Sequence, residues 1–136
     1  MNAEELKERT KQFALRVMRL ADALPNSIKA RAIASQLIRS GMSVAANYRS
    51  ACRSRSRAEF VSKIGIVEEE ADETALWLEL IIVDKILPEK NVSPLLTEAN
   101  ELVKIMAASF ISARNNGSAP RSRSPKSAIR NQQSAI

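Results

Sequence analysis

Residues 27–52 read SIKARAIASQLIRSGMSVAANYRSAC. Along this stretch, small and apolar side chains recur at alternating spacings of four and three residues, which is the period of one face of an α-helix. The positions that follow this rhythm are Ala30, Ala34, Leu37, Gly41, Val44, Tyr48 and Ala51. Ser27 precedes the first of them and can accept a hydrogen bond from a free amide of the first turn. The pattern therefore predicts one long helix over residues 27–52 with a single buried face.

Three other segments repeat this spacing and predict helices over about residues 3–23, 56–87 and 94–114. Pro25 ends the first of these patterns, and Pro88 ends the pattern that precedes residue 94. The connections are only a few residues long, so consecutive helices are expected to be antiparallel neighbours. Because four apolar faces must bury one another, the sequence predicts an all-α, up-down-up-down four-helix bundle.

Two of these helix starts carry specific signals. Ser56 and Glu59 have the Ser-x-x-Glu spacing in which each residue satisfies a free amide of the other, and Ser93 stands before Pro94 as a cap before a first-turn proline. Gly65 is unusual, because a glycine inside a helix costs about 1 kcal/mol relative to alanine. It favours a close helix crossing, which we expect near Gly41.

The C-terminal residues differ in composition from the rest of the chain. From residue 115 onward Gly, Ser, Pro, Asn, Gln and Arg dominate, and the apolar content is too low to offset the entropy lost on ordering. We therefore expect one bundle domain over residues 1–114 and a flexible, Ser/Arg-rich, basic tail over residues 115–136. The tail either adds phosphate contacts or acts only as a solubilising end.

A basic elbow joins the second predicted helix to the third, where residues 50–57 read SACRSRSR. The exposed amides and the dipole of a helix N-terminus favour anions, so arginines beside one are candidates for binding phosphate. An alternative is that they only cap the preceding helix and keep the turn soluble. The candidate nucleic-acid contacts are, in order of preference, Arg49, Arg53, Arg55 and Arg57, then Arg31 and Arg39, then Arg121, Arg123 and Lys126.

Charge is distributed unevenly along the chain, whose net charge is +6. From Lys29 to Lys63 every charged residue except Glu59 is basic, whereas residues 68–101 contain ten acids and only two lysines. This asymmetry predicts surfaces of opposite potential, suited to a polyanion on one side and to subunit packing on another. It also fits simple pairing between neighbouring antiparallel helices.

Several chemistries lack the residues they need. The chain has no histidine, which is the most frequent general base and a ligand of di-iron bundles, and it has no glycine-rich phosphate loop. The acids of residues 68–73 point around a helix and predict an exposed or inter-subunit face more than a metal site. Cys52 is the sole cysteine, expected to pack near a helix end, and no apolar run reaches the roughly 18 residues of a membrane span. The expectation is a non-enzymatic cytoplasmic protein without metal, cofactor or small-molecule substrate.

Tyr48 is expected in the core, whereas Trp77 lies off the main apolar face of its predicted helix. Large rings are favoured at the centres of protein interfaces, so Trp77 is a candidate anchor between subunits, together with Ile66 and Leu80. Burial of Trp77 within one subunit is the competing explanation.

Four segments give the chain a family resemblance: residues 27–29 (SIK), 38–47 (IRSGMSVAAN), 56–60 (SRAEF) and 65–74 (GIVEEEADET). The sequence resembles the bacterial four-helix-bundle family that includes proteins encoded in intervening sequences of large-subunit ribosomal RNA genes. The same family includes the accessory variability determinant of diversity-generating retroelements. The resemblance covers about residues 1–113.

The resemblance implies a non-catalytic bundle, often a ring of five subunits, whose retroelement members bind a reverse transcriptase and nucleic acid through basic surfaces. This chain departs from the family in residues 47–52, NYRSAC, where many relatives follow the asparagine with Ile-Ala-Glu-Gly. The change removes an acid and a glycine, which strengthens the expectation of anion binding. The leading hypothesis is a homo-oligomer, pentameric by resemblance, that binds RNA or DNA through phosphates. The alternative is an adaptor that docks a reverse transcriptase or another enzyme without a direct nucleic-acid role.

Overall fold

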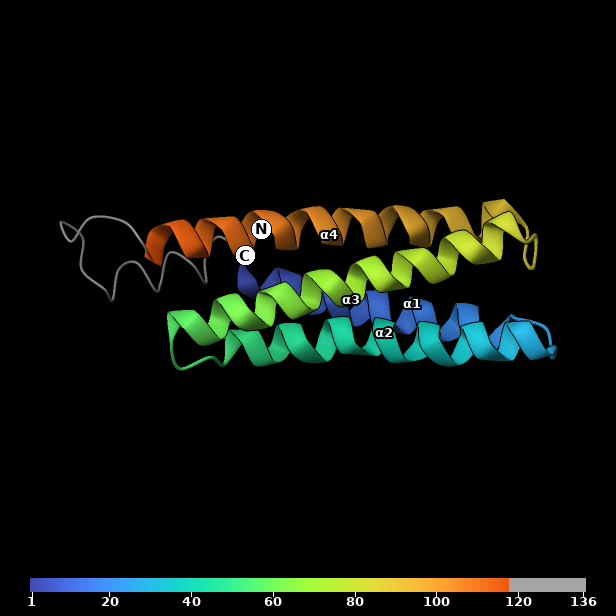
Figure 1. Ribbon diagram of the computed structural model, residues 1–136, viewed down its shortest axis with the longest axis horizontal. Helices are drawn as coiled ribbons and strands as arrows, with labels where there is room; N and C mark the ends of the chain where they lie inside the picture. The colour runs from blue at the N-terminus through green and yellow to red at the C-terminus, as the bar shows by residue number, and fades with distance from the viewer. Residues whose placement is uncertain (118–136) are drawn as a thin grey trace.

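The computed structural model describes residues 1–117, which form four long helices running up, down, up and down (Figure 1). The helices are α1 (Ala3–Asp22), α2 (Ile28–Cys52), α3 (Arg57–Val83) and α4 (Glu89–Gly117). Each packs extensively on its neighbour in sequence, whereas α1 and α4 touch much less. The predicted all-α four-helix bundle is confirmed, and residues 1–117 contain no strand.

The end of the bundle differs slightly from the sequence prediction. Helix α4 continues to Gly117, so residues 115–117 extend the last helix instead of beginning the predicted tail. The remaining tail residues, 118–136, lie outside the described part of the chain.

The predicted caps hold the starts of two helices. Ser27 Oγ accepts a hydrogen bond from the Ala30 amide at 3.2 Å, and Ser56 Oγ accepts one from the Glu59 amide at 3.1 Å. Within residues 1–116 the Ser56 amide does not donate a return bond to the Glu59 carboxylate, so only half of the predicted capping box is present. The cap at Ser56 fixes where the elbow ends and α3 begins.

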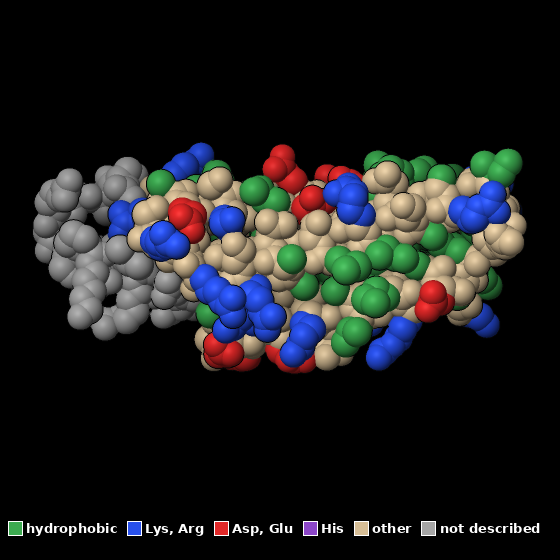
Figure 2. All heavy atoms as spheres, turned by 90° about the horizontal axis from the view of Figure 1, so that it is seen from below, with side chains coloured by type: hydrophobic (Ala, Val, Ile, Leu, Met, Phe, Trp, Pro, Cys, Tyr) green, Lys and Arg blue, Asp and Glu red, His purple; other side chains and the backbone are tan. Residues whose placement is uncertain are grey.

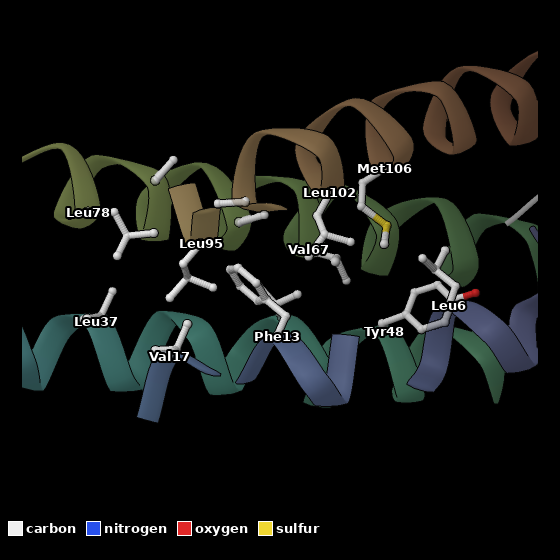
Figure 3. Close-up of a cluster of buried hydrophobic side chains, with 14 of the residues drawn as sticks. Leu6, Phe13, Val17, Leu37, Tyr48, Val67, Leu78, Leu95, Leu102 and Met106 are labelled. Atoms are coloured by element: carbon white, nitrogen blue, oxygen red, sulfur yellow. The ribbon is translucent and has the colours of Figure 1, made fainter. Parts of the chain in front are cut away.

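The apolar faces predicted from periodicity meet in one continuous core (Figure 3). Six of the seven residues of the four-three pattern in α2 are buried and Ala34 is partly buried; Tyr48 is fully buried as expected. The largest side chains that they meet are Leu6, Phe13, Val17, Ile64, Leu78, Ile81, Leu102 and Met106. This core makes the bundle rigid enough to place the polar groups at its ends.

An ion pair links the first and last helices, which pack on each other much less than the helices that are consecutive in sequence. Arg9 donates two hydrogen bonds to the Glu98 carboxylate, at 2.7 Å and 2.8 Å, in a partly buried position. The carboxylate raises the pKa of Arg9. The two-pronged geometry is the favourable form of such a pair, so it helps to hold α1 against α4.

Gly41 and Gly65 face two different helices, whereas we expected them to lie at one helix crossing. A Cβ on Gly41 would lie 2.7 Å from Val17 Cγ1, so this glycine lets α2 approach α1. Gly65 instead faces Phe110 of α4, where a Cβ would lie 3.4 Å from the ring. The prediction that Gly65 crosses near Gly41 was wrong, because the two residues face different neighbouring helices.

Helix α3 ends four residues earlier than predicted. Lys85 adopts a left-handed conformation with φ 58°, its amide bonds the Ile82 carbonyl at 3.0 Å, and the Ile86 amide bonds the Ile81 carbonyl at 2.9 Å. These two bonds form a Schellman motif, which satisfies the carbonyls at the end of a helix. The motif usually contains glycine at the left-handed position, so the lysine hid the helix end in the sequence.

Replacing Lys85 with glycine is expected to stabilise the protein by about 1 kcal/mol, because the left-handed conformation costs a side-chain-bearing residue about that much. The measurement is the free energy of unfolding from urea titration. Lys104→Gly is the matched control: it places glycine on an exposed face of α4 and should destabilise by about 1 kcal/mol. Equal losses in both variants would contradict the expected strain at Lys85.

Helix α4 begins at Glu89, one turn before the predicted start at Pro94. The added turn buries Val92 completely. Burial of a valine contributes about 1.5 kcal/mol or more, which offsets part of the roughly 3 kcal/mol that a proline costs inside a helix. Pro94 therefore sits inside the helix on its exposed side.

None of the helices within residues 1–117 combines the length and apolar character needed to cross a bilayer.

Candidate nucleic-acid interface

The elbow is a tight turn between two well-capped helices. The Arg53 amide bonds the Ser50 carbonyl at 3.0 Å and the Ser54 amide bonds the Ala51 carbonyl at 3.1 Å, so α2 closes with a narrow last turn. Ser56 then starts α3. The last turn of α2 and the first two turns of α3 consequently lie close together at one end of the bundle.

An open hollow of about 520 Å³ lies at this end, lined by four cations and one acid. The cations are Arg49, Arg53, Arg55 and Lys63, and the acid is Glu59. The three arginines are exposed and Lys63 is half-buried. Figure 2 shows basic side chains gathered toward this end of the surface formed around α2.

The four cations of the hollow have no ion-pair partner within residues 1–116. Even Glu59, which shares the hollow, lies too far from them for a salt bridge. Their charges are therefore available to an external anion. Arginine is suited to phosphate because its planar fork donates two parallel hydrogen bonds.

Arg57, a first-choice contact in the sequence, points elsewhere. Its Nη1 donates to the Asn116 carbonyl at 3.2 Å, and its Nε is buried without a hydrogen-bond partner among the described residues. A cation beside the last carbonyls of a helix interacts favourably with the helix dipole. Arg57 thus joins the start of α3 to the end of α4 and does not line the hollow.

The two second-choice arginines of α2 are engaged within the protein. Arg31 donates to the Asn26 side chain at 2.7 Å. Arg39 pairs closely with Glu73 and, at 3.6 Å, with Glu70. The candidate tail contacts Arg121, Arg123 and Lys126 lie outside the described residues.

The candidate interface residues of α3 separate into two kinds. Trp77 is half-buried against the core, and its Nε1 donates to Glu73 Oε2 at 3.2 Å. Ile66 and Leu80 are 36% and 40% exposed, as are the further apolar residues Leu76, at 47%, and Val83, at 78%. An apolar surface therefore lies on the outer side of α3, with Trp77 at its edge and partly within the protomer.

Lys63 was not among the candidate site residues of the sequence. It follows Glu59 by one helical turn, so both residues lie on the same side of α3. The four-residue spacing between Glu59 and Lys63 could have predicted this position from the sequence, because residues one turn apart lie on the same side of a helix.

Tyr48 and Cys52 lie one turn apart in α2, close to the elbow but inside the core. Burial raises the pKa of both groups and is the main cause in each. The thiol also raises the pKa of Tyr48 but lacks hydrogen-bond geometry, so the buried Tyr48 hydroxyl has no partner among the described residues. A thiol with a raised pKa is a weak nucleophile, in line with the expected packing role of Cys52.

Tyr48→Phe is expected to leave stability at pH 7 unchanged or to raise it by about 1 kcal/mol, because it removes a buried, unsatisfied hydroxyl. The raised pKa of Tyr48 stabilises the fold below its ordinary value of 10.0, and this stability is lost as pH rises beyond it. The loss should approach about 1.4 kcal/mol per pH unit above that value in the wild type.

The check is the free energy of urea unfolding at pH 7, 9, 10 and 11. Tyr48→Phe should flatten the loss above pH 10, whereas Cys52→Ala should flatten only the part that begins near 9.0, the ordinary value for a thiol. Identical alkaline profiles for wild type and Tyr48→Phe would show that the Tyr48 hydroxyl is not desolvated.

No group of three or more His, Cys, Asp or Glu side chains within the described residues is arranged to hold a metal ion. What the geometry supplies is a fixed set of positive charges at the end of a rigid all-α bundle. These features define a helical-bundle protein with a cationic elbow.

Comparison with known protein families identifies the family of this chain. A sequence profile described as "23S rRNA-intervening sequence protein" matches residues 4–108, so the chain belongs to the family of 23S rRNA-intervening sequence proteins. This confirms the resemblance to rRNA intervening-sequence proteins, and the retroelement branch is not indicated by the match.

A solved structure shares the fold. It is a protein of unknown function from the S23 ribosomal protein family of Bacteroides thetaiotaomicron, with a TM-score of 0.72 and 33% identity. The similarity covers 76% of this chain and 96% of the other. The comparison with curated proteins gave no match. Neither similarity indicates a catalytic activity.

Proposed function

We propose that this protein is a non-catalytic, homo-oligomeric bundle that binds RNA or DNA through the phosphate backbone. The observation that carries the proposal is the hollow at the elbow, where Arg49, Arg53, Arg55 and Lys63 gather without internal ion pairs. Membership of a family named for intervening sequences of 23S rRNA favours RNA as the ligand.

Binding of this kind requires only that the cations be positioned to pair with phosphates. Each guanidinium that pairs with a phosphate releases condensed counterions, so affinity falls as salt rises, with a slope of about −0.9 per contact on duplex DNA and about −0.7 on single strands. Four contacts per protomer therefore predict a slope near −3.6 on a duplex. The hollow offers no array of aromatic rings to read bases, so binding should depend little on sequence.

The remaining candidate residues take secondary places in this proposal. Arg57 positions α3 against α4, Arg31 and Arg39 would have to leave their internal partners, and Arg121, Arg123 and Lys126 add auxiliary charge. The protomers assemble as a pentamer, as the family resemblance implies, and the protein acts in the cytoplasm without a cofactor.

The proposal is tested by fluorescence anisotropy with labelled single-stranded RNA, an RNA hairpin and duplex DNA at salt concentrations from 50 to 200 mM. Binding with a steep negative salt slope on at least one probe is the expected result. Absence of binding at 50 mM, or a flat slope, would overturn it.

Capture from nuclease-treated lysate separates the proposal from the adaptor hypothesis. A stoichiometric protein, such as a reverse transcriptase, that survives nuclease treatment while purified protein binds no nucleic acid would favour the adaptor. Loss of all captured material after nuclease treatment agrees with direct nucleic-acid binding.

A further inference from the structure

The outer side of α3 has the composition of a contact surface. Its side chains recur at three- and four-residue spacings, so they form one stripe opposite the core. Four members are apolar and exposed: Leu76, Leu80 and Val83 form a row, and Ile66 lies ten residues before Leu76, beyond Glu69 and Asp72. Exposed apolar residues that form a contiguous row indicate an interaction surface, whereas scattered ones do not.

Acidic side chains accompany this stripe. Glu69, Asp72 and Glu79 are exposed on the same side of α3 and have no ion-pair partner within residues 1–116. A complementary surface would therefore be apolar with positive charge beside it.

The protein carries such a surface on its other helices. A groove of about 410 Å³ runs between α1 and α2, with an apolar floor that includes Leu15, Met18, Met42, Ala45 and Ala46. Lys7 and Lys11 lie along it, paired with Glu4 and Glu8 at 2.7 and 3.2 Å, so the groove's unpaired positive charge within residues 1–116 is Arg49. Arg49 and Ala46 also line the cationic hollow. Figure 2 shows apolar side chains exposed on this side of the bundle, next to basic ones.

The two surfaces agree in length. At 1.5 Å per residue, the groove from Glu4 to Met18 is about 21 Å long and the stripe from Ile66 to Val83 is about 26 Å long. One α3 helix can therefore lie along the groove over about four turns, the length of the shorter surface.

The charges of the two halves of the chain favour contact between different surfaces of two copies. Residues 1–57, which contain α1, α2 and the elbow, carry 12 Lys and Arg against 4 Asp and Glu. Residues 58–117 carry 5 against 11. The net charges of +8 and −6 mean that contact between like halves of two copies is repulsive, whereas contact between unlike halves is attractive.

We infer that the copies assemble head to tail, with the outer stripe of α3 of one protomer docked in the α1–α2 groove of the next. A contact between different surfaces repeats from copy to copy and gives a closed ring when the rotation closes. The inference rests on the homo-oligomer of the proposed function and specifies which surfaces form it. Because Arg49 borders both groove and hollow, every interface also places a neighbouring α3 beside a phosphate-binding hollow.

Site-directed cross-linking tests the pairing in the full chain. In a Cys52→Ala background, Met18→Cys and Leu80→Cys introduce single thiols at exposed positions of the groove and the stripe. A short bismaleimide should link a mixture of the two variants and should link neither variant alone. A mixture of Leu80→Cys with Lys104→Cys, an exposed position on α4, is the control and should not link.

A second measurement uses native mass. Leu76→Glu with Leu80→Glu should reduce the assembly to the 15.0 kDa protomer without loss of helical circular dichroism, because both side chains are exposed in the protomer. Ile111→Glu, an exposed apolar residue of α4, is the matched control and should leave the assembly intact.

The outcomes distinguish this inference from the proposed function. Self-linking of Leu80→Cys, or an intact assembly in the Leu76/Leu80 variant, would overturn the head-to-tail contact alone. A wild-type mass of one protomer would overturn both the contact and the homo-oligomer, and the anisotropy salt slope would still decide nucleic-acid binding.

Discussion

A variant with Arg49, Arg53 and Arg55 replaced by glutamine is expected to lose most of the salt dependence of nucleic-acid binding. With four phosphate contacts, wild-type affinity for duplex DNA should fall about 150-fold between 50 and 200 mM salt. With Lys63 alone the fall should be about 3- to 4-fold, because each lost contact removes about 0.9 from the slope. Glutamine keeps much of the side-chain length and polarity, and these three residues are exposed, so the fold should be unaffected.

The control removes three charges elsewhere on the surface. Arg19, Lys90 and Lys104 are exposed, take no part in an ion pair within residues 1–116, and do not line the hollow. Their replacement by glutamine gives the same net charge as the elbow variant. If both variants lower the salt slope equally, binding depends on total charge and the hollow is not the site.

Gly41→Ala is expected to destabilise the bundle by about 2 kcal/mol, even though alanine is the better helix former. The new Cβ would lie 2.7 to 2.9 Å from Val17 Cγ1, Cβ and Cγ2. Overpacking of this kind costs about 1–3 kcal/mol. Rotation of Val17 cannot relieve the clash, because its Cβ is itself too close and a valine in a helix is held in one rotamer.

Gly65→Ala supplies the matched comparison within the same fold. Its Cβ would meet the Phe110 ring at 3.4 Å, an ordinary contact, so the gain in helix propensity of about 1 kcal/mol should dominate. Urea unfolding should therefore give opposite signs for the two variants. A stabilising Gly41→Ala would mean that α1 and α2 do not approach as closely as the packing of Val17 requires.

The helices could be predicted from sequence because the four-three spacing is local and each apolar face needs only the others to cover it. The ends of the helices were harder to predict. Lys85 occupies a position where glycine is the usual signal, and Val92 adds a turn before Pro94 only because the assembled core can bury it. These boundaries depend on tertiary packing, which no short stretch of sequence encodes.

The elbow was predicted as a cationic surface, but the set of residues that line the hollow was not. At about 100° per residue, Arg57 lies about 200° around α3 from Glu59, so it faces α4 instead. Lys63 takes its place in the hollow. The engagement of Arg39 with Glu73 required knowledge of how α2 and α3 align, since the two residues are far apart in sequence.

The bond from Arg57 to Asn116 shows that α4 finishes beside the elbow, and the antiparallel order brings the start of α1 to the same end (Figure 1). A domain fused directly before α1 would hence lie beside the arginines of the elbow and obstruct them in a binding assay. Labels and surface attachment are best placed at the other end of the bundle, on the turns that follow Asp22 and Val83. There they do not obstruct the approach of a long polyanion to the elbow.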